Sequence, residues 1–366
     1  MSDDAKQLLA KYEPKVVKAI QPDRQVYRLR FSPCGKFLVG AGLDATVRRW
    51  DAASAEYTEL PALQGHHAWV SAIAFHPKGP LLFTADSWGQ LRAWKYDADQ
   101  PATVWSNEQA HDGWLRGIAV SPDGATLATC GLDRVVRIWS TQDGKKQHEL
   151  AGHEDDVYAV AWSPDGKALV SGDVKGVLKQ WDLAAGKATR ALDASSLYKL
   201  HRLQDLGGLR TLMFDADGKR LFAAGSAPTS GATFQGTPTV LVFDFASGQL
   251  AKTLSLGQPK NCFVEDAAVH ADGFIMAVTS GTPGDGQFLF IRPDDDKPFF
   301  TNTKLANCHA LAVHPDGRRL AVAATNTGSN GNGRQLTKDG EYPGNFSPIA
   351  VMELPGGGKA EQQASS

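Results

Sequence analysis

Three side chains of metal-binding or acid–base type, Asp156, Glu265 and His309, stand six or eight residues before the third residue of a five-residue phrase that recurs along the chain. Carboxylate oxygens and imidazole nitrogens are common ligands of divalent metal ions. One hypothesis is therefore a metal site, with His201 as a further ligand. The three residues belong to the fourth, sixth and seventh copies of the phrase, so they would converge only where all copies meet. The alternative, which we favour, is a polar channel lined with water.

Other signatures of catalysis are missing from the sequence. We find no phosphate-binding loop, no nucleophile elbow and no paired metal-ligand motif. The four cysteines, Cys34, Cys130, Cys262 and Cys308, lack metal-ligand spacing. Cys262 and Cys308 lie in matching strands of adjacent repeats and could form a disulfide, but we favour a small buried thiol at Cys308. We therefore expect no catalytic residue, no metal ion and no cofactor, and we predict a protein that is not an enzyme.

Aromatic and arginine side chains occupy the same positions before the phrase in most copies. Trp, Tyr and Arg are the residue types enriched in binding hot spots. Some of these side chains could instead cap the core, but chance does not readily give a whole ring of them. We predict a partner-binding surface, with Trp69 and Trp114 as its best pair because they are equivalent in neighbouring repeats. The predicted contact residues are Tyr27, Trp69, Trp88, Trp114, Arg116, Tyr158, Arg210, Phe263, Glu265 and His309.

The phrase itself predicts a tight turn. Its proline fixes φ, its aspartate or lysine tolerates the corner, and its closing glycine supplies a positive φ. The closing glycines lie 42 to 55 residues apart, a spacing that indicates a repeat architecture. The seven copies are Phe31–Gly35, Phe75–Gly79, Val120–Gly124, Trp162–Gly166, Phe214–Gly218, Val269–Gly273 and Val313–Gly317.

Apolar residues at fixed offsets predict strands on both sides of each turn. Counted back from the third residue of the phrase, positions 7, 4 and 2 are apolar in every copy, as in Val26, Leu29 and Phe31. The gap of two is the period of a strand, and the gap of three contains one extra residue, which a β-bulge would absorb. A second strand follows the turn, and a third strand often ends in tryptophan, as at Trp139.

In this pattern the chain resembles the WD-repeat family of β-propellers, over about residues 13–355. The resemblance implies an all-β, seven-bladed propeller of four-stranded antiparallel blades and a scaffolding function. It also implies a hydrogen-bonded network of His, Ser or Thr, Asp and Trp within a blade. Repeats two and four place Asp86 and Asp173 two residues early, and the last three repeats lack the pattern. The full pattern occurs only in the third repeat, as His111, Thr129, Asp133 and Trp139.

The two ends of the chain predict how the ring closes. The last repeat stops after a third strand at Ile349–Leu354, while Lys15–Ile20 is a spare strand before the first repeat. Pairing these two would complete the last blade and remove exposed sheet edges. Residues 1–12 are expected to form a frayed helix outside the ring, and residues 356–366 a disordered tail.

Four insertions interrupt the later repeats. Asp193–Gly208 joins repeats four and five and can hold a helical turn. Ser226–Pro238, Ser280–Gly286 and Thr325–Ser347 lie between the second and third strands of repeats five, six and seven. Long loops of this kind tend to be functional or disordered. For Thr325–Ser347, which is rich in Gly and Asn, the sequence leaves both possibilities open.

Composition and charge narrow the functional class. The formal net charge of −2 argues against a nucleic-acid-binding surface. No apolar stretch approaches a membrane span, and the N-terminus lacks the basic and apolar regions of a signal peptide. We therefore expect a cytoplasmic propeller, monomeric or a subunit of a larger complex, that binds a protein or peptide and neither nucleic acid nor membrane. The alternative is a propeller enzyme, or a small-molecule or metal-binding protein, that acts at the mouth of the central channel.

Overall fold

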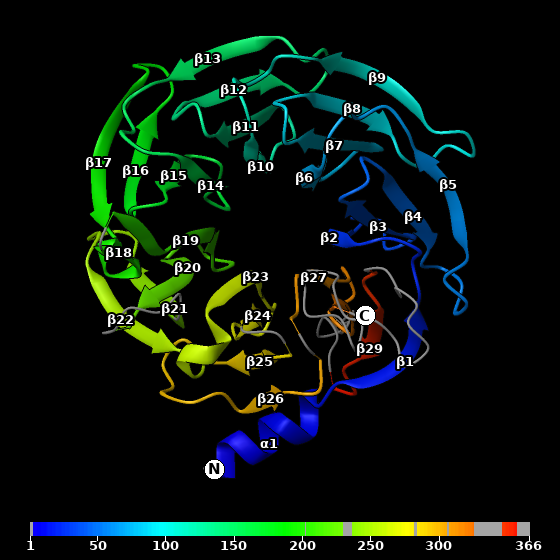
Figure 1. Cartoon of the computed structure of the whole chain (residues 1–366), viewed down its shortest axis with the longest axis vertical. Coiled ribbons are helices and arrows are strands. Elements are labelled where there is room, and N and C mark those ends of the chain that lie inside the picture. Colours follow the sequence, from blue (N-terminus) through cyan, green and yellow to red (C-terminus); the bar gives the residue numbers. More distant parts are fainter. Residues whose placement is uncertain are drawn as a thin grey trace, which may run out of the picture.

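The computed structural model describes residues 3–201, 203–229, 236–281, 284–305, 307–325 and 346–356. Within these residues the strands form seven antiparallel sheets. The sheets are arranged as blades around a central axis (Figure 1). The predicted fold, an all-β, seven-bladed propeller of four-stranded blades, is confirmed.

The first four blades each contain four strands that are consecutive in sequence and in space. Blade one consists of β2 (Val26–Phe31), β3 (Phe37–Gly42), β4 (Val47–Asp51) and β5 (Glu59–Leu63). Blade two consists of β6 (Val70–Phe75), β7 (Leu81–Asp86), β8 (Leu91–Lys95) and β9 (Ala102–Asn107). Blade three consists of β10 (Leu115–Val120), β11 (Thr126–Gly131), β12 (Val136–Ser140) and β13 (Lys146–Leu150). Blade four consists of β14 (Val157–Trp162), β15 (Leu169–Asp173), β16 (Val177–Asp182) and β17 (Lys187–Asp193).

Blades five and six are less regular. Blade six begins after a 3₁₀ turn, η2 (Pro259–Asn261), and its outer strand has only three residues. Blade five has four strands and an added strand, β18, which pairs with the start of β19. The strands of blade five are β18 (Tyr198–His201), β19 (Gln204–Phe214), β20 (Arg220–Pro228), β21 (Gly236–Asp244) and β22 (Leu250–Ser255). Those of blade six are β23 (Phe263–Val269), β24 (Ile275–Ser280), β25 (Gly286–Ile291) and β26 (Phe300–Asn302).

The structure describes two of the four predicted insertions well. Asp193–Gly208 contains the expected helical turn, η1 (Ser195–Leu197), and also the β18–β19 hairpin, which we did not predict. At Ser226–Pro238 the β20–β21 ladder continues outward as far as the pair Pro228 and Gly236. Most of Thr325–Ser347 and the predicted tail after residue 356 lie outside the described residues, so these predictions remain open.

Blade seven joins the two ends of the chain. Its strands run in the order β1 (Lys15–Ile20), β29 (Ile349–Glu353), β28 (Arg319–Ala323) and β27 (Ala310–Val313). In the β1–β29 pair, Lys15 lies opposite Glu353 and Ile20 opposite Ile349. Figure 1 shows β1 beside β29 on the outside of the ring. The predicted closure by the N-terminal strand is confirmed.

The hydrophobic core lies between the blades rather than within them. One cluster, for example, combines Val39 and Val47 of blade one with Val70 and Leu82 of blade two. Clusters of the same kind occur between the other neighbouring blades. A single sheet cannot bury its own faces, so the ring is stabilised only when neighbours stack. None of the four cysteines, all of which the structure describes, forms a disulfide bond, which excludes the one that we considered between Cys262 and Cys308.

The polar network extends over three blades, one of which has the full sequence pattern. In blade two, the ring nitrogens of His66 lie 3.0 Å from the Asp86 carboxylate and 2.6 Å from Thr84 Oγ1. Trp94 Nε1 donates to the same Thr84 oxygen at 2.7 Å. Blade three has the predicted network, and blade four repeats it with Ser and Asp173. An Asp two residues early therefore still reaches its His, which the sequence pattern did not show.

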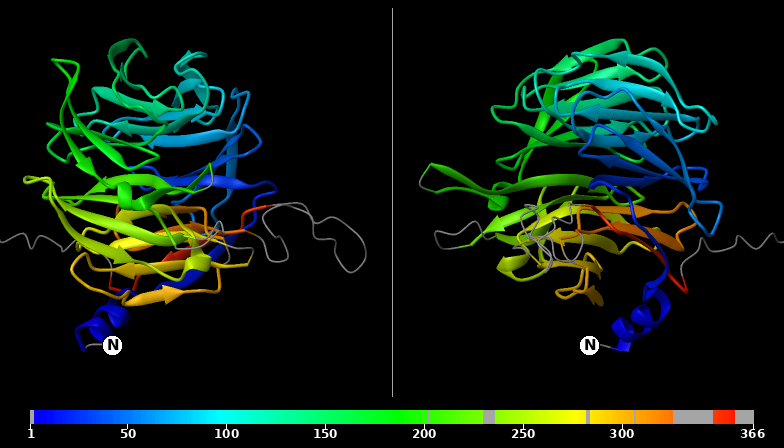
Figure 2. Two further views of the ribbon diagram at one scale, coloured as in Figure 1. Left: turned by 60° about the vertical axis from the view of Figure 1, so that its left-hand side comes forward. Right: turned by 45° about the vertical axis from the view of Figure 1, so that its right-hand side comes forward.

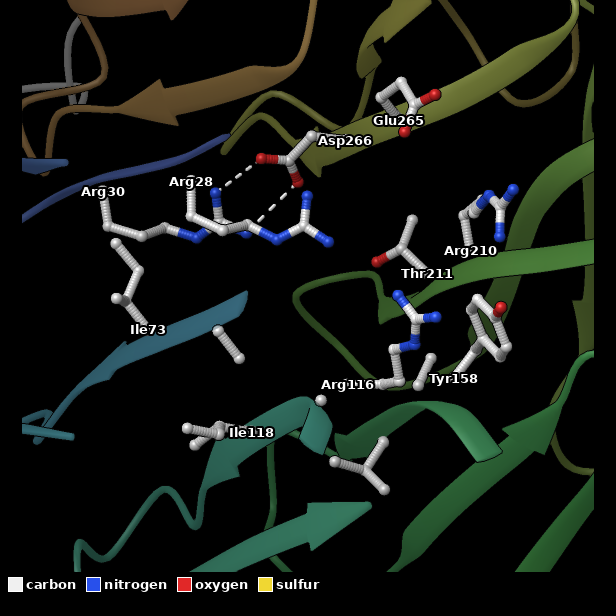
Figure 3. A pocket seen from close by; sticks show the side chains of 14 residues that line it. Arg28, Arg30, Ile73, Arg116, Ile118, Tyr158, Arg210, Thr211, Glu265 and Asp266 are labelled. Carbon is white, nitrogen blue, oxygen red and sulfur yellow. Dashed lines mark hydrogen bonds and ion pairs between the residues drawn. The ribbon is translucent and has the colours of Figure 1, made fainter. Parts of the chain in front are cut away.

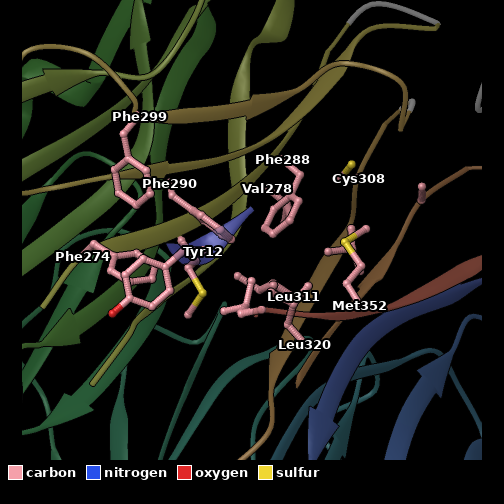
Figure 4. Close-up of a cluster of buried hydrophobic side chains, with 14 residues drawn as sticks. Tyr12, Phe274, Val278, Phe288, Phe290, Phe299, Cys308, Leu311, Leu320 and Met352 are labelled. Carbon is pink, nitrogen blue, oxygen red and sulfur yellow. The ribbon is translucent and has the colours of Figure 1, made fainter. Parts of the chain in front are cut away.

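The N-terminal helix packs against the ring from outside the blades. Helix α1 (Asp3–Tyr12) lies below the blades in Figure 2, and Tyr12 at its end is only 1% exposed. Tyr12 packs with Phe274 and Phe290 of blade six in the cluster drawn in Figure 4. Ala5 and Leu8 pack against this cluster from the same helix. The expected helix outside the ring is present, but it is not frayed, because its apolar residues recur at helical spacing and cover the cluster.

Candidate interaction face at the channel mouth

In six of the seven blades, the inner strand carries the predicted bulge. In β2 the register with β3 shifts between Val26 and Arg28, so Tyr27 has no partner in the ladder. A bulge leaves one residue unpaired and redirects its side chain. In blade seven, His309 precedes the inner strand. The bulged residues of the next five blades are Ser71, Arg116, Tyr158, Arg210 and Glu265. We call the end of the channel where these positions gather the channel mouth.

Five predicted contact residues from four neighbouring blades form one continuous stack. The guanidinium carbon of Arg116 lies 3.5 Å from the centre of the Trp114 ring and 4.8 Å from that of Tyr158. The guanidinium carbon of Arg210 lies 5.3 Å from the centre of Tyr158 and 4.4 Å from that of Phe263. Each cation–π contact is worth about 0.5–2 kcal/mol, depending on exposure. We call these five residues, Trp114, Arg116, Tyr158, Arg210 and Phe263, the arginine–aromatic belt.

Three tryptophans continue this surface over blades one to three. Trp69 meets Trp114 edge to face, with ring centres 6.0 Å apart. Trp69 is 50% exposed and Trp88 is 69% exposed, although both are large apolar side chains. The three line an open groove of about 560 Å³, which we call the tryptophan groove. Its other lining residues are Leu43, Asp44, Ala45, His67, Ala68 and Ser87.

The belt holds two cations in partly buried surroundings. Burial lowers the pKa of Arg116, and the positive charges of Arg210 and Arg28 lower it further. An arginine keeps its charge in proteins even after such a shift. Among the described residues, neither Arg116 nor Arg210 donates a hydrogen bond to a backbone or side-chain group, and neither forms an ion pair. The aromatic rings cover the faces of the guanidinium groups and leave their N–H edges unused.

The other predicted contact residues are held within their own blades. Glu265 accepts a hydrogen bond of 2.5 Å from the Ser280 hydroxyl, and His309 Nε2 lies 2.7 Å from Thr325 Oγ1. Burial lowers the pKa of His309, although the nearby Glu265 carboxylate opposes this shift. The Tyr27 ring lies under the Arg28 guanidinium, at 4.4 Å. These three residues therefore border the channel mouth without joining the belt.

The metal hypothesis is not supported. Within the part of the chain that the structure describes, no three His, Cys, Asp or Glu residues lie close enough together to hold a metal ion. Asp156 interacts instead with the charges of Arg134 and Arg116, which oppose the rise in its pKa that burial causes. Asp156, Glu265, His309 and His201 consequently do not form the site that their residue types suggested.

The sequence interpretation missed three charged residues inside the channel: Arg28, Arg30 and Asp266. They line a cavity of about 90 Å³ together with Arg116, Arg210 and Glu265 (Figure 3). The signal was present in the sequence. Counted back from the third residue of the phrase, positions 5 and 3 hold Gly, Ala, Thr or Met in every repeat except at these three residues. A charge in a narrow channel otherwise lined by small residues is unusual and points to a specific contact.

That contact is an ion pair across the ring. Arg30 donates to both oxygens of Asp266, at 2.6 and 3.1 Å, and so joins blade one to blade six. Asp266 also accepts the backbone N–H of Leu311 at 3.1 Å, and Arg30 donates to the Leu311 carbonyl at 3.0 Å. The Asp266 side chain is 4% exposed. This two-bonded geometry is the strong form of the arginine–carboxylate pair, and here it spans blade seven.

Comparison with known proteins agrees with this architecture. The family model described as "WD domain, G-beta repeat" matches residues 15–51, 57–95, 103–140 and 144–182, that is, the closing strand β1 and the strands from β2 to β16. The described part of the chain contains no helix with the length and hydrophobicity of a membrane span.

Curated relatives match parts of the chain. "Target of rapamycin complex subunit wat1" of Schizosaccharomyces pombe is 32% identical over 36% of this chain and 41% of its own length. "Nuclear distribution protein PAC1" of Arthroderma otae is 38% identical over 17% of this chain and 13% of its own length. "Polyadenylation factor subunit 2" of Cryptococcus neoformans is 28% identical over 38% of this chain and 19% of its own length. The matches thus span less than half of each relative. The chain is thus a seven-bladed β-propeller that contains four matched WD repeats.

Proposed function

We propose that this protein is a non-enzymatic scaffold that binds a protein or peptide at the channel mouth, over the arginine–aromatic belt and the tryptophan groove. The observation that carries the proposal is the exposure of Trp69 and Trp88 beside an ordered stack of arginine and aromatic side chains. A groove with rigid aromatic walls and an adjoining row of cations is suited to a partner that offers apolar and polar groups together.

The names of the relatives support a role in assemblies. Two of them are called subunits, of a target of rapamycin complex and of a polyadenylation factor. We infer that this chain also works with protein partners, and that Tyr27, Glu265 and His309 border the contact surface. A cytoplasmic location, a monomeric ring and the absence of nucleic-acid and membrane ligands remain predictions.

The proposal is tested with a Trp69→Ala/Trp88→Ala double variant. Both side chains are at least half exposed, so their removal should leave the fold intact. Leu250→Ala is the matched control, because Leu250 is 46% exposed but lies on the outer strand of blade five. A partner is first captured from lysate of the source organism with the wild-type protein, then purified and titrated against all three proteins.

We expect the double variant to bind the purified partner at least ~30-fold more weakly, which corresponds to about 2 kcal/mol at a hot spot. The Leu250→Ala variant should bind like the wild type. Equal affinity of the wild type and the double variant for every partner found would overturn the proposal for this groove.

A further inference from the structure

The cavity in the central channel has an excess of positive charge. Its lining contains four arginines and two carboxylates, and the remaining lining residues are uncharged. Asp266 is fully engaged by Arg30 and the Leu311 backbone. Arg28, Arg116 and Arg210 are therefore opposed in this lining only by Glu265. Figure 3 shows Arg116 of blade three and Arg210 of blade five approaching the cavity, with Glu265 on another side.

The arginines also offer hydrogen-bond donors that the described residues leave unused. Arg28 donates from Nε to the Ser71 carbonyl at 3.2 Å, but its buried Nη1 has no partner in the described structure. The buried Nε of Arg116 likewise has none there. Buried polar atoms without a partner are rare in native proteins and commonly indicate an ion or an ordered water.

The aromatic rings fix the direction in which these donors point. Trp114 and Tyr158 cover Arg116, and Tyr158 and Phe263 flank Arg210. With its faces covered, a guanidinium group can bind only through its N–H edge, in the geometry that suits carboxylate and phosphate oxygens. Arg28, Arg116 and Arg210 come from blades one, three and five, so a ligand would be contacted from three directions.

We propose that Arg28, Arg116 and Arg210 form a binding site for a single phosphate group, either as the free ion or as a phosphate monoester. The cavity of about 90 Å³ is several times the roughly 10–15 Å³ that a single water molecule needs, so it has room for one such group. A phosphate offers oxygens toward all three arginines, whereas a planar carboxylate offers only two. Glu265 is the one feature of the site that disfavours an anion, and it provides a sharp test.

The test is a calorimetric titration of the full chain with inorganic phosphate at low ionic strength. The variants are Arg116→Gln, Arg210→Gln and Glu265→Gln. Arg24→Gln is the control, because Arg24 is exposed and its replacement changes the net charge by the same amount. We expect one saturable site in the wild type and in Arg24→Gln, and binding at least tenfold weaker in Arg116→Gln and Arg210→Gln.

Glu265→Gln should bind phosphate several-fold more tightly, because it removes the one opposing charge. This gain cannot result from misfolding, so it keeps the test decisive if the arginine variants are unstable. O-phosphoserine serves as a second titrant: binding of both titrants supports a site open to monoesters, and binding of inorganic phosphate alone supports a site for the free ion.

No saturable binding of phosphate to the wild type, or equal binding in the wild type and Arg116→Gln, would overturn the proposal and leave a water-filled channel. The proposal shares Arg116 and Arg210 with the surface proposed for the partner, but the two tests can fail separately. It uses isolated protein and variants within the channel, whereas the scaffold proposal is tested in the tryptophan groove.

Discussion

His270 donates a hydrogen bond from Nε2 to the carbonyl oxygen of Gly317 at 3.0 Å, and so links the turn of blade six to the turn of blade seven. The backbone N–H of Asp272 donates to Nδ1 of the same ring at 3.1 Å, which places the proton on Nε2. His314 makes the equivalent contact with Gly35, at 2.9 Å, between blades seven and one. These two histidines of the repeated phrase thus connect neighbouring blades.

The contact between His314 and Gly35 should stabilise the closed ring. We expect His314→Ala to lower the free energy of unfolding by about 1–2 kcal/mol, because it removes a buried hydrogen bond and ring packing. His67→Ala, at an exposed position, is the control and should change it by less than about 0.5 kcal/mol. Urea denaturation measures both, and equal stability of the two variants would contradict a role in closure.

The N-terminal segment should be essential for stability. Deletion of residues 1–20 removes β1 from blade seven and Tyr12 from the core cluster, so we expect a large fall in the melting temperature. Tyr12→Ala alone should cost about 3 kcal/mol or more, as for other large buried aromatic side chains. Gln7→Ala, on the exposed side of the helix, is the control. An unchanged melting temperature after the deletion would contradict this role.

The ion pair between Arg30 and Asp266 across the ring should stabilise the folded protein. We expect Asp266→Ala to lower the free energy of unfolding by about 1–3 kcal/mol; this is below the value for a fully buried pair, because the Arg30 side chain remains 37% exposed. A double-mutant cycle with Arg30→Ala isolates the coupling between the two residues. A coupling energy near zero would show that the pair does not hold blades one and six together.

Stability should fall on acidification through the polar network of blade three. Burial lowers the pKa of His111, despite its hydrogen bond to Asp133. Below the usual histidine value of about 6.5, the unfolded chain therefore binds more protons than the folded protein. The stabilisation from neutral His111 is present above this pH and is lost as the pH falls.

Asp133 adds to this effect at lower pH. Burial would raise its pKa, but hydrogen bonds from His111 and Arg137 hold it well below its usual range. Its stabilisation is present above the unfolded value of about 3.9 and is lost below it. Urea denaturation at pH 7 and pH 5.5 should show lower stability at pH 5.5, with a smaller difference in His111→Gln. The same pH dependence in that variant would contradict the assignment to His111.

Much of this fold could be predicted because short stretches of the sequence specify its turns and strands. The phrase that ends at Gly35 and its six relatives encode a turn, and the flanking apolar offsets encode a bulged strand and its neighbour. The unpaired strand at Lys15–Ile20 and the incomplete last repeat encode the closure. These features depend on backbone conformation and on strand period, which a few consecutive residues determine.

The tertiary structure decided the contacts between blades. Arg30 and Asp266 are 236 residues apart, and only the curvature of the closed ring brings them within 2.6 Å. The stacking of Arg116 on Tyr158, and the reach of Asp86 to His66, depend in the same way on side-chain directions set by packing. The sequence by itself determined seven blades and the positions that face the channel mouth. The contacts between those side chains formed only when the blades packed around one axis. Each contact joins residues of different blades, and the order of residues along the chain does not determine how far apart they lie in space.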